Sequence, residues 1–142
     1  MGSGRRLEKP AMKFDWPVQI YWEDTDAGGV VYHSQYLNFM ERARTEFLRS
    51  LGLMQTLLRD EFGILFVVRD IQIRFKKPAK FDDALNVNTA LIKVGRSLLE
   101  FEQNIYRGDE HLIAAKVDVV CIGADSFRPV SIPEKMMRLL ML

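Results

Sequence analysis

The sequence predicts an α+β fold, in which an antiparallel sheet of about five strands lies against one long helix. Between Ser34 and Leu51, apolar residues recur at helical spacing over a longer stretch than anywhere else in the chain. After Gly63 the pattern changes to alternating runs of polar and apolar residues, which short glycine-containing turns separate. Because short turns join neighbouring antiparallel strands, we expect the second half of the chain to form a meander.

The size and charge of the chain are those of an ordinary globular protein. Its 142 residues, 48% of them hydrophobic and 27% charged, are enough to bury a core. We expect a flexible, basic N-terminal tail over residues 1–13 and a single domain over residues 14–142. The formal net charge is +1, and no run of like charges follows the tail, so we expect no nucleic-acid partner.

Cysteine and histidine usage excludes several kinds of site. Cys121 is the only cysteine, which rules out an internal disulfide and a cysteine-based zinc site, and its apolar surroundings are typical of a core residue. The two histidines are far apart and form no H-E-x-x-H motif, so we expect neither a metal nor another cofactor. No apolar run is long enough to span a membrane, and we expect a cytoplasmic protein.

The first elements are a strand and an acidic loop. Pro17 precedes an apolar run over Val18–Trp22, which we expect to form a short strand. The loop over Glu23–Gly29 follows, and its Gly28-Gly29 pair allows backbone angles that other residues resist.

The longest expected element is a helix over Ser34–Leu51, about 27 Å in length. Ser34 suits the N-cap, and Gly52 suits the position after the last turn. The residues on its apolar face are Tyr36, Met40, Ala43, Phe47 and Leu51.

The remaining elements follow the long helix in order. A short helix is expected over Leu53–Glu61, ended by Gly63. The four later strands are expected at Phe66–Phe75, Leu85–Val94, Leu98–Tyr106 and Leu112–Ile122, before a terminal helix over Pro133–Leu142. A sheet covered by one helix leaves a face and edges open, so we expect a homo-oligomer, either a dimer or a homotetramer.

Candidate catalytic residues gather around the start of the long helix. Asp24 and Asp26 precede Gly28-Gly29, and His33 follows seven residues after Asp26. A carboxylate between apolar walls can act as base or nucleophile, and a helix N-terminus offers N–H groups to a polarised oxygen. Aspartates are also common in solvated turns, and Asp24 can instead orient or cap the loop. His33 is a candidate for catalysis or for a structural position.

Other catalytic classes lack their motifs. The chain has no G-x-S-x-G elbow, no Gly-rich dinucleotide motif and no P-loop. The sequence therefore favours chemistry at a carboxylate beside a helix N-terminus.

The sequence resembles the YbgC-type acyl-CoA thioesterases, hotdog-fold relatives of 4-hydroxybenzoyl-CoA thioesterase. The resemblance rests on the run YWEDTDAGGVVYH (residues 21–33), on MERARTEFLR (residues 40–49) and on FVVRD (residues 66–70), and it covers about residues 16–134. It implies a hotdog fold, in which the sheet wraps around the long helix, and hydrolysis of an acyl thioester carried on CoA or on an acyl carrier protein.

The resemblance also implies roles for individual residues. Asp26 falls on the catalytic carboxylate of the family, acting as nucleophile or as base for water, and His33 takes a supporting position. The thioester carbonyl is expected at backbone N–H groups near Tyr32 to Ser34, beside Gly28 and Gly29. A CoA site between subunits is expected, with Arg96 and Arg128 as the candidates for its phosphates. Trp22 and Ser34-Gln35 depart from the usual residues of the family, and either departure can narrow the acyl pocket.

Three alternatives stay open at the level of the sequence. A hotdog hydratase or dehydratase also pairs a carboxylate with a histidine on an acyl thioester. A thioesterase with its carboxylate on the long helix would use Glu41 or Glu46. A non-catalytic protein that binds acyl thioesters would need no turnover at all.

Overall fold

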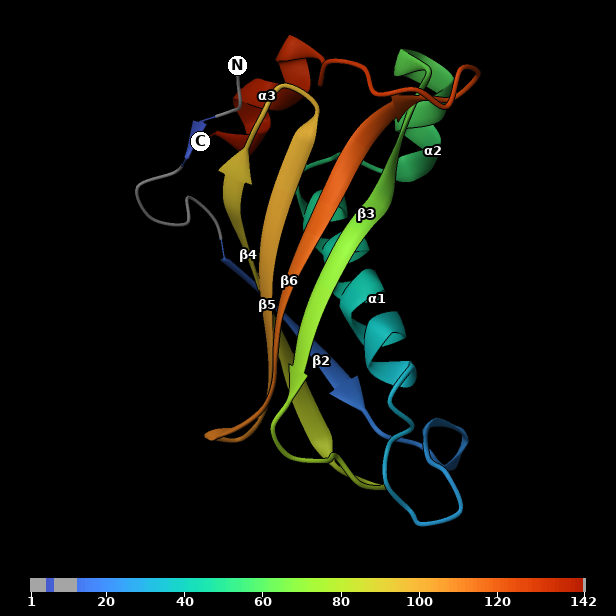
Figure 1. Ribbon diagram of the computed structural model, residues 1–142, viewed down its shortest axis with the longest axis vertical. Helices are drawn as coiled ribbons and strands as arrows, with labels where there is room; N and C mark the ends of the chain where they lie inside the picture. Colours follow the sequence, from blue (N-terminus) through green and yellow to red (C-terminus); the bar gives the residue numbers. More distant parts are fainter. Residues whose placement is uncertain (1–4, 7–12, 142) are drawn as a thin grey trace.

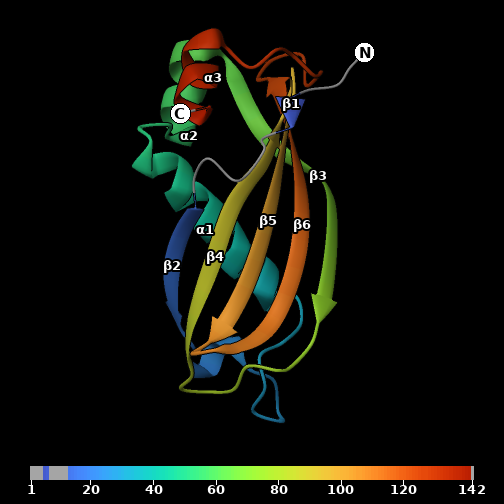
Figure 2. The ribbon, with the colours of Figure 1, turned by 90° about the vertical axis from the view of Figure 1, so that its left-hand side faces the viewer.

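The computed structural model describes residues 5–6 and 13–141, in which a curved antiparallel sheet wraps around one long helix (Figures 1 and 2). The strands are β1 (Arg5–Arg6), β2 (Lys13–Gln19), β3 (Ile64–Phe75), β4 (Ala84–Val94), β5 (Leu98–Arg107) and β6 (Glu110–Gly123). Their order in the sheet is β1–β4–β5–β6–β3, and β2 pairs with β4 as well. Of the expected tail, residues 1–4 and 7–12 lie outside the described residues.

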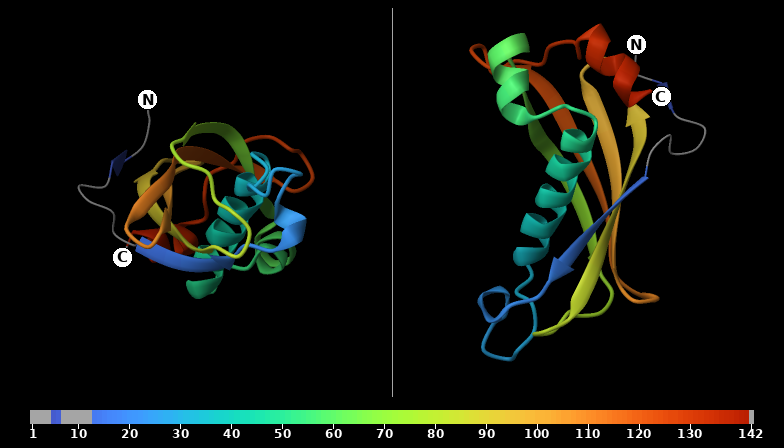
Figure 3. Two further views of the ribbon diagram at one scale, coloured as in Figure 1. Left: turned by 90° about the horizontal axis from the view of Figure 1, so that it is seen from below. Right: turned by 180° about the vertical axis from the view of Figure 1, so that it is seen from behind.

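The long helix α1 (Gln35–Ser50) lies in the hollow of the sheet (Figure 3). Its buried side chains include Phe39, Met40, Ala43 and Phe47, close to the apolar face that the sequence predicts. Gly52 follows the helix with a φ of 81°, as expected for a glycine after the last turn. Seen from below, the strands curve around α1 (Figure 3, left), so one face of the sheet is covered by the helix.

The predicted N-cap role of Ser34 is wrong. Ser34 itself has a helical conformation (φ −73°, ψ −18°), and its side chain makes no capping hydrogen bond. The turn begins earlier, because the N–H of Gln35 donates to the carbonyl of Tyr32 at 2.9 Å. The helical curl of the chain therefore starts within the loop and leaves no extended residue to act as a cap.

The position of the first long strand also differs from the prediction. It spans Lys13–Gln19 instead of Val18–Trp22, and Trp22 lies in a short 3₁₀ turn, η1 (Trp22–Asp24). Polar and apolar residues alternate along β2, so that Phe14, Trp16 and Val18 are half-buried. Pro17 is tolerated inside the strand because β2 lies at an edge of the sheet.

The later elements agree with the sequence to within two residues at each strand end. The predicted short helix is α2 (Gln55–Leu57) running into η2 (Leu58–Phe62), and Gly63 ends it in the left-handed conformation with a φ of 65°. The terminal helix α3 spans Glu134–Leu140. Strands β3 to β6 form the expected antiparallel ladders, and β3 carries an irregularity between Val68 and Asp70.

The core fills the space between α1 and the concave face of the sheet. One cluster packs Phe47 against Phe101 and reaches Met136 of α3, and another surrounds Phe39 near the start of α1. Cys121 is buried in the first cluster, and burial raises the pKa of its thiol to about 11, so it is a core residue as predicted.

Two ends of the sheet matter for the site. The loop end holds the β2–α1 loop, the β3–β4 connection and the β5–β6 turn, at the bottom of Figure 1. The far end holds α2, α3 and the β4–β5 turn. In the described part of the chain, no helix is long and apolar enough to cross a membrane.

Candidate active site

The loop between β2 and α1 is closed by Asp24, whose side chain is only 6% exposed. Its carboxylate accepts hydrogen bonds from the N–H of Tyr21 at 2.9 Å and from the side chain of Gln35 at 2.8 Å. Its backbone carbonyl accepts the N–H of Tyr32 at 3.1 Å. Asp24 thus ties the loop to the first residue of α1, which is the orienting role that the sequence left open.

Asp26 lies in the tight turn that the two glycines make possible. Its Oδ1 atom accepts the N–H of Gly28 at 2.8 Å, and its carbonyl accepts the N–H of Gly29 at 3.0 Å. A Cβ at Gly28 would lie 3.3 Å from that Oδ1 atom, and Gly29 has a φ of 80°. The turn holds the carboxylate by its own backbone, and the N–H of Asp26 donates to Val30 at 2.9 Å.

The side chain of Asp26 is exposed in the single chain. The apolar walls that the sequence led us to expect around this carboxylate are therefore absent from the single chain. In the described residues, no hydrogen bond joins Asp26 to His33, whose ring is exposed and packs on Tyr32 with 4.5 Å between ring centroids.

The backbone at the start of α1 offers donors, although fewer than expected. The N–H of Tyr32 is already used by Asp24, so Tyr32 cannot supply the expected backbone donor in this conformation. The N–H groups of His33 and Ser34 have no acceptor among the described residues. They lie at the positive end of a 16-residue helix, where a polarised oxygen is stabilised.

A cleft of about 280 Å³ lies between the start of α1 and the end of β3. His33 and Tyr36 line one side, and Phe75 lies opposite. Tyr36 is buried and its hydroxyl accepts the N–H of Ala79 at 2.9 Å, which fixes the β3–β4 connection against the helix. The run Lys76-Lys77-Pro78 completes the lining.

Phe75 and the residues after it line part of the cleft, which was not predicted from the sequence. The available signal was a basic Lys-Lys-Pro run directly after a predicted strand. Trp22 is 67% exposed and stacks on Phe81, with 3.6 Å between ring centroids, so it does not line this cleft.

The two predicted phosphate-binding arginines lie at the far end. Arg96 is in the β4–β5 turn, where its Nε donates to the hydroxyl of Ser131 at 2.7 Å. Arg128 follows β6, and its backbone carbonyl accepts the N–H of Gly123 at 2.9 Å. The 11 residues of β4 separate this end from the loop end by about 35 Å, so the single chain does not bring these arginines to Asp26.

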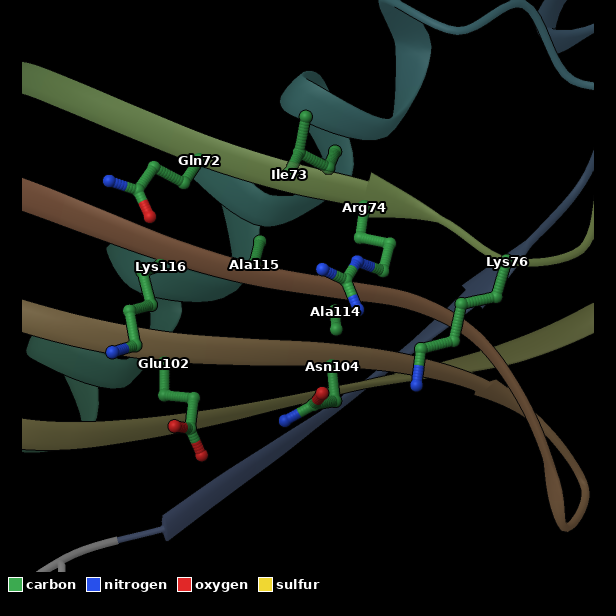
Figure 4. A pocket seen from close by; sticks show the side chains of 9 residues that line it. All are labelled: Gln72, Ile73, Arg74, Lys76, Glu102, Asn104, Ala114, Ala115 and Lys116. Atoms are coloured by element: carbon green, nitrogen blue, oxygen red, sulfur yellow. The ribbon is translucent and has the colours of Figure 1, made fainter.

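A second hollow lies on the outer face of the sheet, away from α1 (Figure 4). Arg74, Lys76 and Lys116 reach into it together with Glu102, from β5, β6 and the end of β3. None of the predicted site residues lines it. Within the ranges that the structure describes, no group of three His, Cys, Asp or Glu side chains could hold a metal ion.

The helix carboxylates are poorly placed for chemistry at the loop. Glu41 lies six residues beyond Gln35, about 9 Å along the helix axis. Glu46 lies further along and pairs with Arg49 at 3.3 Å. Asp26 precedes the open N–H groups of His33 and Ser34 by seven and eight residues and lies in the loop that leads into α1.

Comparison with known proteins identifies similar chains. A model of the thioesterase-like superfamily matches residues 20–140. The acyl-CoA thioesterase YbgC of Haemophilus influenzae is 44% identical over 122 residues, which cover 86% of this chain and 90% of that protein. The acyl-CoA thioester hydrolase YbgC of Escherichia coli is 42% identical, covering 85% and 90%. A crystal structure of a probable thioesterase from Bartonella henselae has a TM-score of 0.82 and 38% identity, covering 86% of this chain and 100% of that one.

Proposed function

The chain belongs to the thioesterase-like superfamily and is a thioester hydrolase with the hotdog fold, and from this premise we propose that it hydrolyses acyl-CoA to a free acid and CoA. The proposal takes its substrate class from the relatives in H. influenzae and E. coli. Asp26 is the proposed catalytic carboxylate, and the N-terminus of α1 is the proposed oxyanion site.

The observation that carries this proposal is that the Asp26 carboxylate is held in a tight turn of the loop that leads into α1. Gly28 holds the carboxylate through one hydrogen bond, and the second oxygen has no described protein donor. Seven and eight residues after Asp26, at the start of α1, the N–H groups of His33 and Ser34 have no acceptor among the described residues. A carbonyl bound there would be polarised by preorganised donors, which is how hydrolases stabilise a tetrahedral intermediate.

Two routes are consistent with this arrangement. As general base, Asp26 takes a proton from water, and the oxygen of that water bonds to the thioester carbon. As nucleophile, a carboxylate oxygen of Asp26 bonds to the same carbon, and water then cleaves the resulting anhydride. In both routes the C–S bond breaks, and the CoA sulfur leaves as a thiolate that takes up a proton.

We place the thioester of the substrate at His33 and in the cleft beside it. The backbone N–H of His33 is a donor to the oxyanion, and its exposed ring is free to contact the thioester. Phe75 and Tyr36 offer apolar surface to the first carbons of the acyl chain. Gly28 and Gly29 shape the turn so that Asp26 can approach the carbonyl.

We also propose that CoA binds between two subunits. Strand β3 lies at an edge of the sheet, and it exposes the apolar side chains of Val67, Val68 and Phe75. Antiparallel pairing of β3 with its copy would extend the sheet and turn the second subunit end for end. Arg96 and Arg128 of one subunit would then approach the loop end of the other, where its Asp26 lies.

The mass of the protein in solution tests this arrangement. Sedimentation equilibrium should give a dimer or a tetramer. Val68→Lys in the middle of β3 should shift the mass toward the monomer, while Lys116→Gln on the outer sheet face should not. A wild-type protein that is a monomer at micromolar concentration and still hydrolyses acyl-CoA would contradict the shared site.

The reaction is tested by thiol release from a panel of short, long and aromatic acyl-CoA esters. Asp26→Asn keeps an oxygen that accepts the N–H of Gly28, so this variant should fold while losing most turnover. Asp125→Asn, an exposed aspartate at the far end, is the matched control and should retain wild-type activity. Turnover by Asp26→Asn at the wild-type rate would refute the assignment.

The same panel separates the rival functions. Loss of enoyl-thioester absorbance without thiol release would identify a hydratase. Tight binding of acyl-CoA without consumption would identify a binding protein. Release from acyl carrier protein thioesters but not from CoA esters would replace CoA by the carrier protein as the substrate carrier.

A further inference from the structure

Arg44 is a buried cation that the proposed reaction does not use. It lies in the middle of α1 and is 8% exposed. Its Nη1 donates to the side-chain oxygen of Gln103 at 2.9 Å. Gln103 in turn donates to the carbonyl of Met40 at 3.0 Å and to the hydroxyl of Thr89 at 2.9 Å. These bonds fix the orientation of the guanidinium, but every partner in this network is neutral.

No carboxylate in the described part of the chain forms an ion pair with Arg44. Glu41, one turn earlier on α1, is exposed to solvent, where its charge is screened. Burial lowers the pKa of Arg44, and the charge of Glu41 opposes this only in part. A buried charge is normally paired, and Arg44 has no carboxylate bonded to it in the described residues, although the exposed Glu41 lines the same cavity.

The guanidinium lines a cavity of about 460 Å³ between α1 and β3. The apolar walls of this cavity come from Leu48, Phe66, Val67, Val68, Phe101 and Val119. Its polar lining besides Arg44 is Glu41, Thr45 and Gln55. The volume lies in the range of small-molecule sites. Glu41 is exposed and Arg44 is buried, so the enclosed part of the cavity combines apolar walls with one oriented cation, which is complementary to an amphiphilic anion.

We propose that this cavity binds a carboxylate attached to an apolar body, and that Arg44 holds the carboxylate. The planar guanidinium has donors left over from its bond to Gln103, and these match a carboxylate in geometry and charge. The apolar walls take the hydrocarbon part of the ligand. Binding of such an anion neutralises the only buried arginine of the described residues.

A carboxylate on an apolar body can come from two sources. Arg44 lies nine residues after Gln35, about 14 Å along α1 from the helix start. A separate fatty acid could therefore occupy the cavity while the cleft at His33 is empty. Alternatively, the carboxylate is the far end of an acyl group whose thioester carbonyl lies at the helix start; only this second source rests on the proposed thioesterase function.

Calorimetric titration with sodium octanoate tests the site without any turnover. Octanoate should bind the wild-type protein, and Arg44→Gln should weaken binding at least about tenfold, the loss expected for a hydrogen-bonded charge. Arg42→Gln removes the same charge from the exposed face of α1 and should bind as the wild type does. Octanol, which lacks the carboxylate, should bind wild type and Arg44→Gln equally.

A second variant guards against misfolding of Arg44→Gln. Thr45→Phe puts a ring into the cavity from α1 and keeps Arg44. The affinities for octanoate and for octanol should therefore both fall. Absence of octanoate binding to the wild type, or equal binding by Arg44→Gln, would overturn the proposal. Loss of the oligomer in Arg44→Gln, with no octanoate binding to the wild type, would instead place Arg44 in a subunit contact.

Kinetics separate the two sources. A preference of the wild type for an ω-carboxyoctanoyl-CoA over octanoyl-CoA, lost in Arg44→Gln, identifies the acyl group as the source. Octanoate binding without such a preference identifies a separate acid. If neither ester is hydrolysed, the thioesterase assignment fails, but the calorimetric result for octanoate still stands.

Discussion

Replacing Asp24 should lower mainly the stability of the protein, whereas replacing Asp26 should lower mainly its activity. Asp24→Ala removes a buried carboxylate that accepts hydrogen bonds from Tyr21 and Gln35. Hydrogen bonds to a charged group contribute about 1.5–3 kcal/mol each, and Gln35 is half-buried, so we expect a loss of about 3 kcal/mol. For a chain of this size, that loss lowers Tm by about 6–12 °C. Asp26→Ala gives up one hydrogen bond at an exposed side chain, for about 1 kcal/mol or less.

Differential scanning calorimetry and thiol release should therefore rank the two variants in opposite orders. Asp24→Ala should melt well below Asp26→Ala, yet at 15 °C it should retain measurable hydrolysis of the best acyl-CoA. Asp26→Ala should melt near the wild type and be inactive. Equal melting of Asp24→Ala and the wild type would refute the view that Asp24 closes the loop. Greater destabilisation by Asp26→Ala than by Asp24→Ala would refute the division of roles.

Three further outcomes follow from single residues. Cys121 should react with a thiol reagent at pH 8 only after unfolding, because burial raises its pKa to about 11; rapid labelling of the native protein would contradict its core position. Gly29→Ala should cost about 1–2 kcal/mol in urea unfolding, because φ is 80° there, and an unchanged midpoint would argue against that turn. Arg107 lowers the pKa of Glu110, so the pair stabilises the fold above the ordinary carboxyl pKa of 4.5 and is lost as the pH falls through the lower folded-state value. Arg107→Gln should flatten the decline of stability below pH 5, and a decline as steep as that of the wild type would exclude this contribution.

The helix and the later strands could be predicted because their patterns are long and regular. From Tyr36 to Phe47 the apolar residues recur at a spacing that fits only a helix. From Leu98 onward, each strand is bounded by a glycine turn. The strand β2 was misplaced because Pro17 was taken as its beginning, although an edge strand accepts a proline in its interior. Ser34 was misassigned because a residue type that favours caps does not reveal where the preceding loop begins to curl.

The turn that holds Asp26 was predictable from the sequence, but the surroundings of its carboxylate were not. The spacing of Asp26 and Gly28-Gly29 points to a tight turn, which the backbone forms with a hydrogen bond to the carboxylate. The expected apolar walls around Asp26 are absent from the single chain, where its side chain is exposed. The burial of Arg44 did leave a signal: Gln103 falls at an inward position between Phe101 and Ile105, which is unusual for a polar residue.

The way in which Asp24 closes the loop has a consequence for engineering. The bonds that give the loop its shape run through the carboxylate of Asp24, the side chain of Gln35 and backbone groups. The side chains of Ala27 and Val30 take no part in them. A combinatorial library at these two positions could therefore vary the rim of the loop over a wide chemical range while the hydrogen bonds beneath it stay intact.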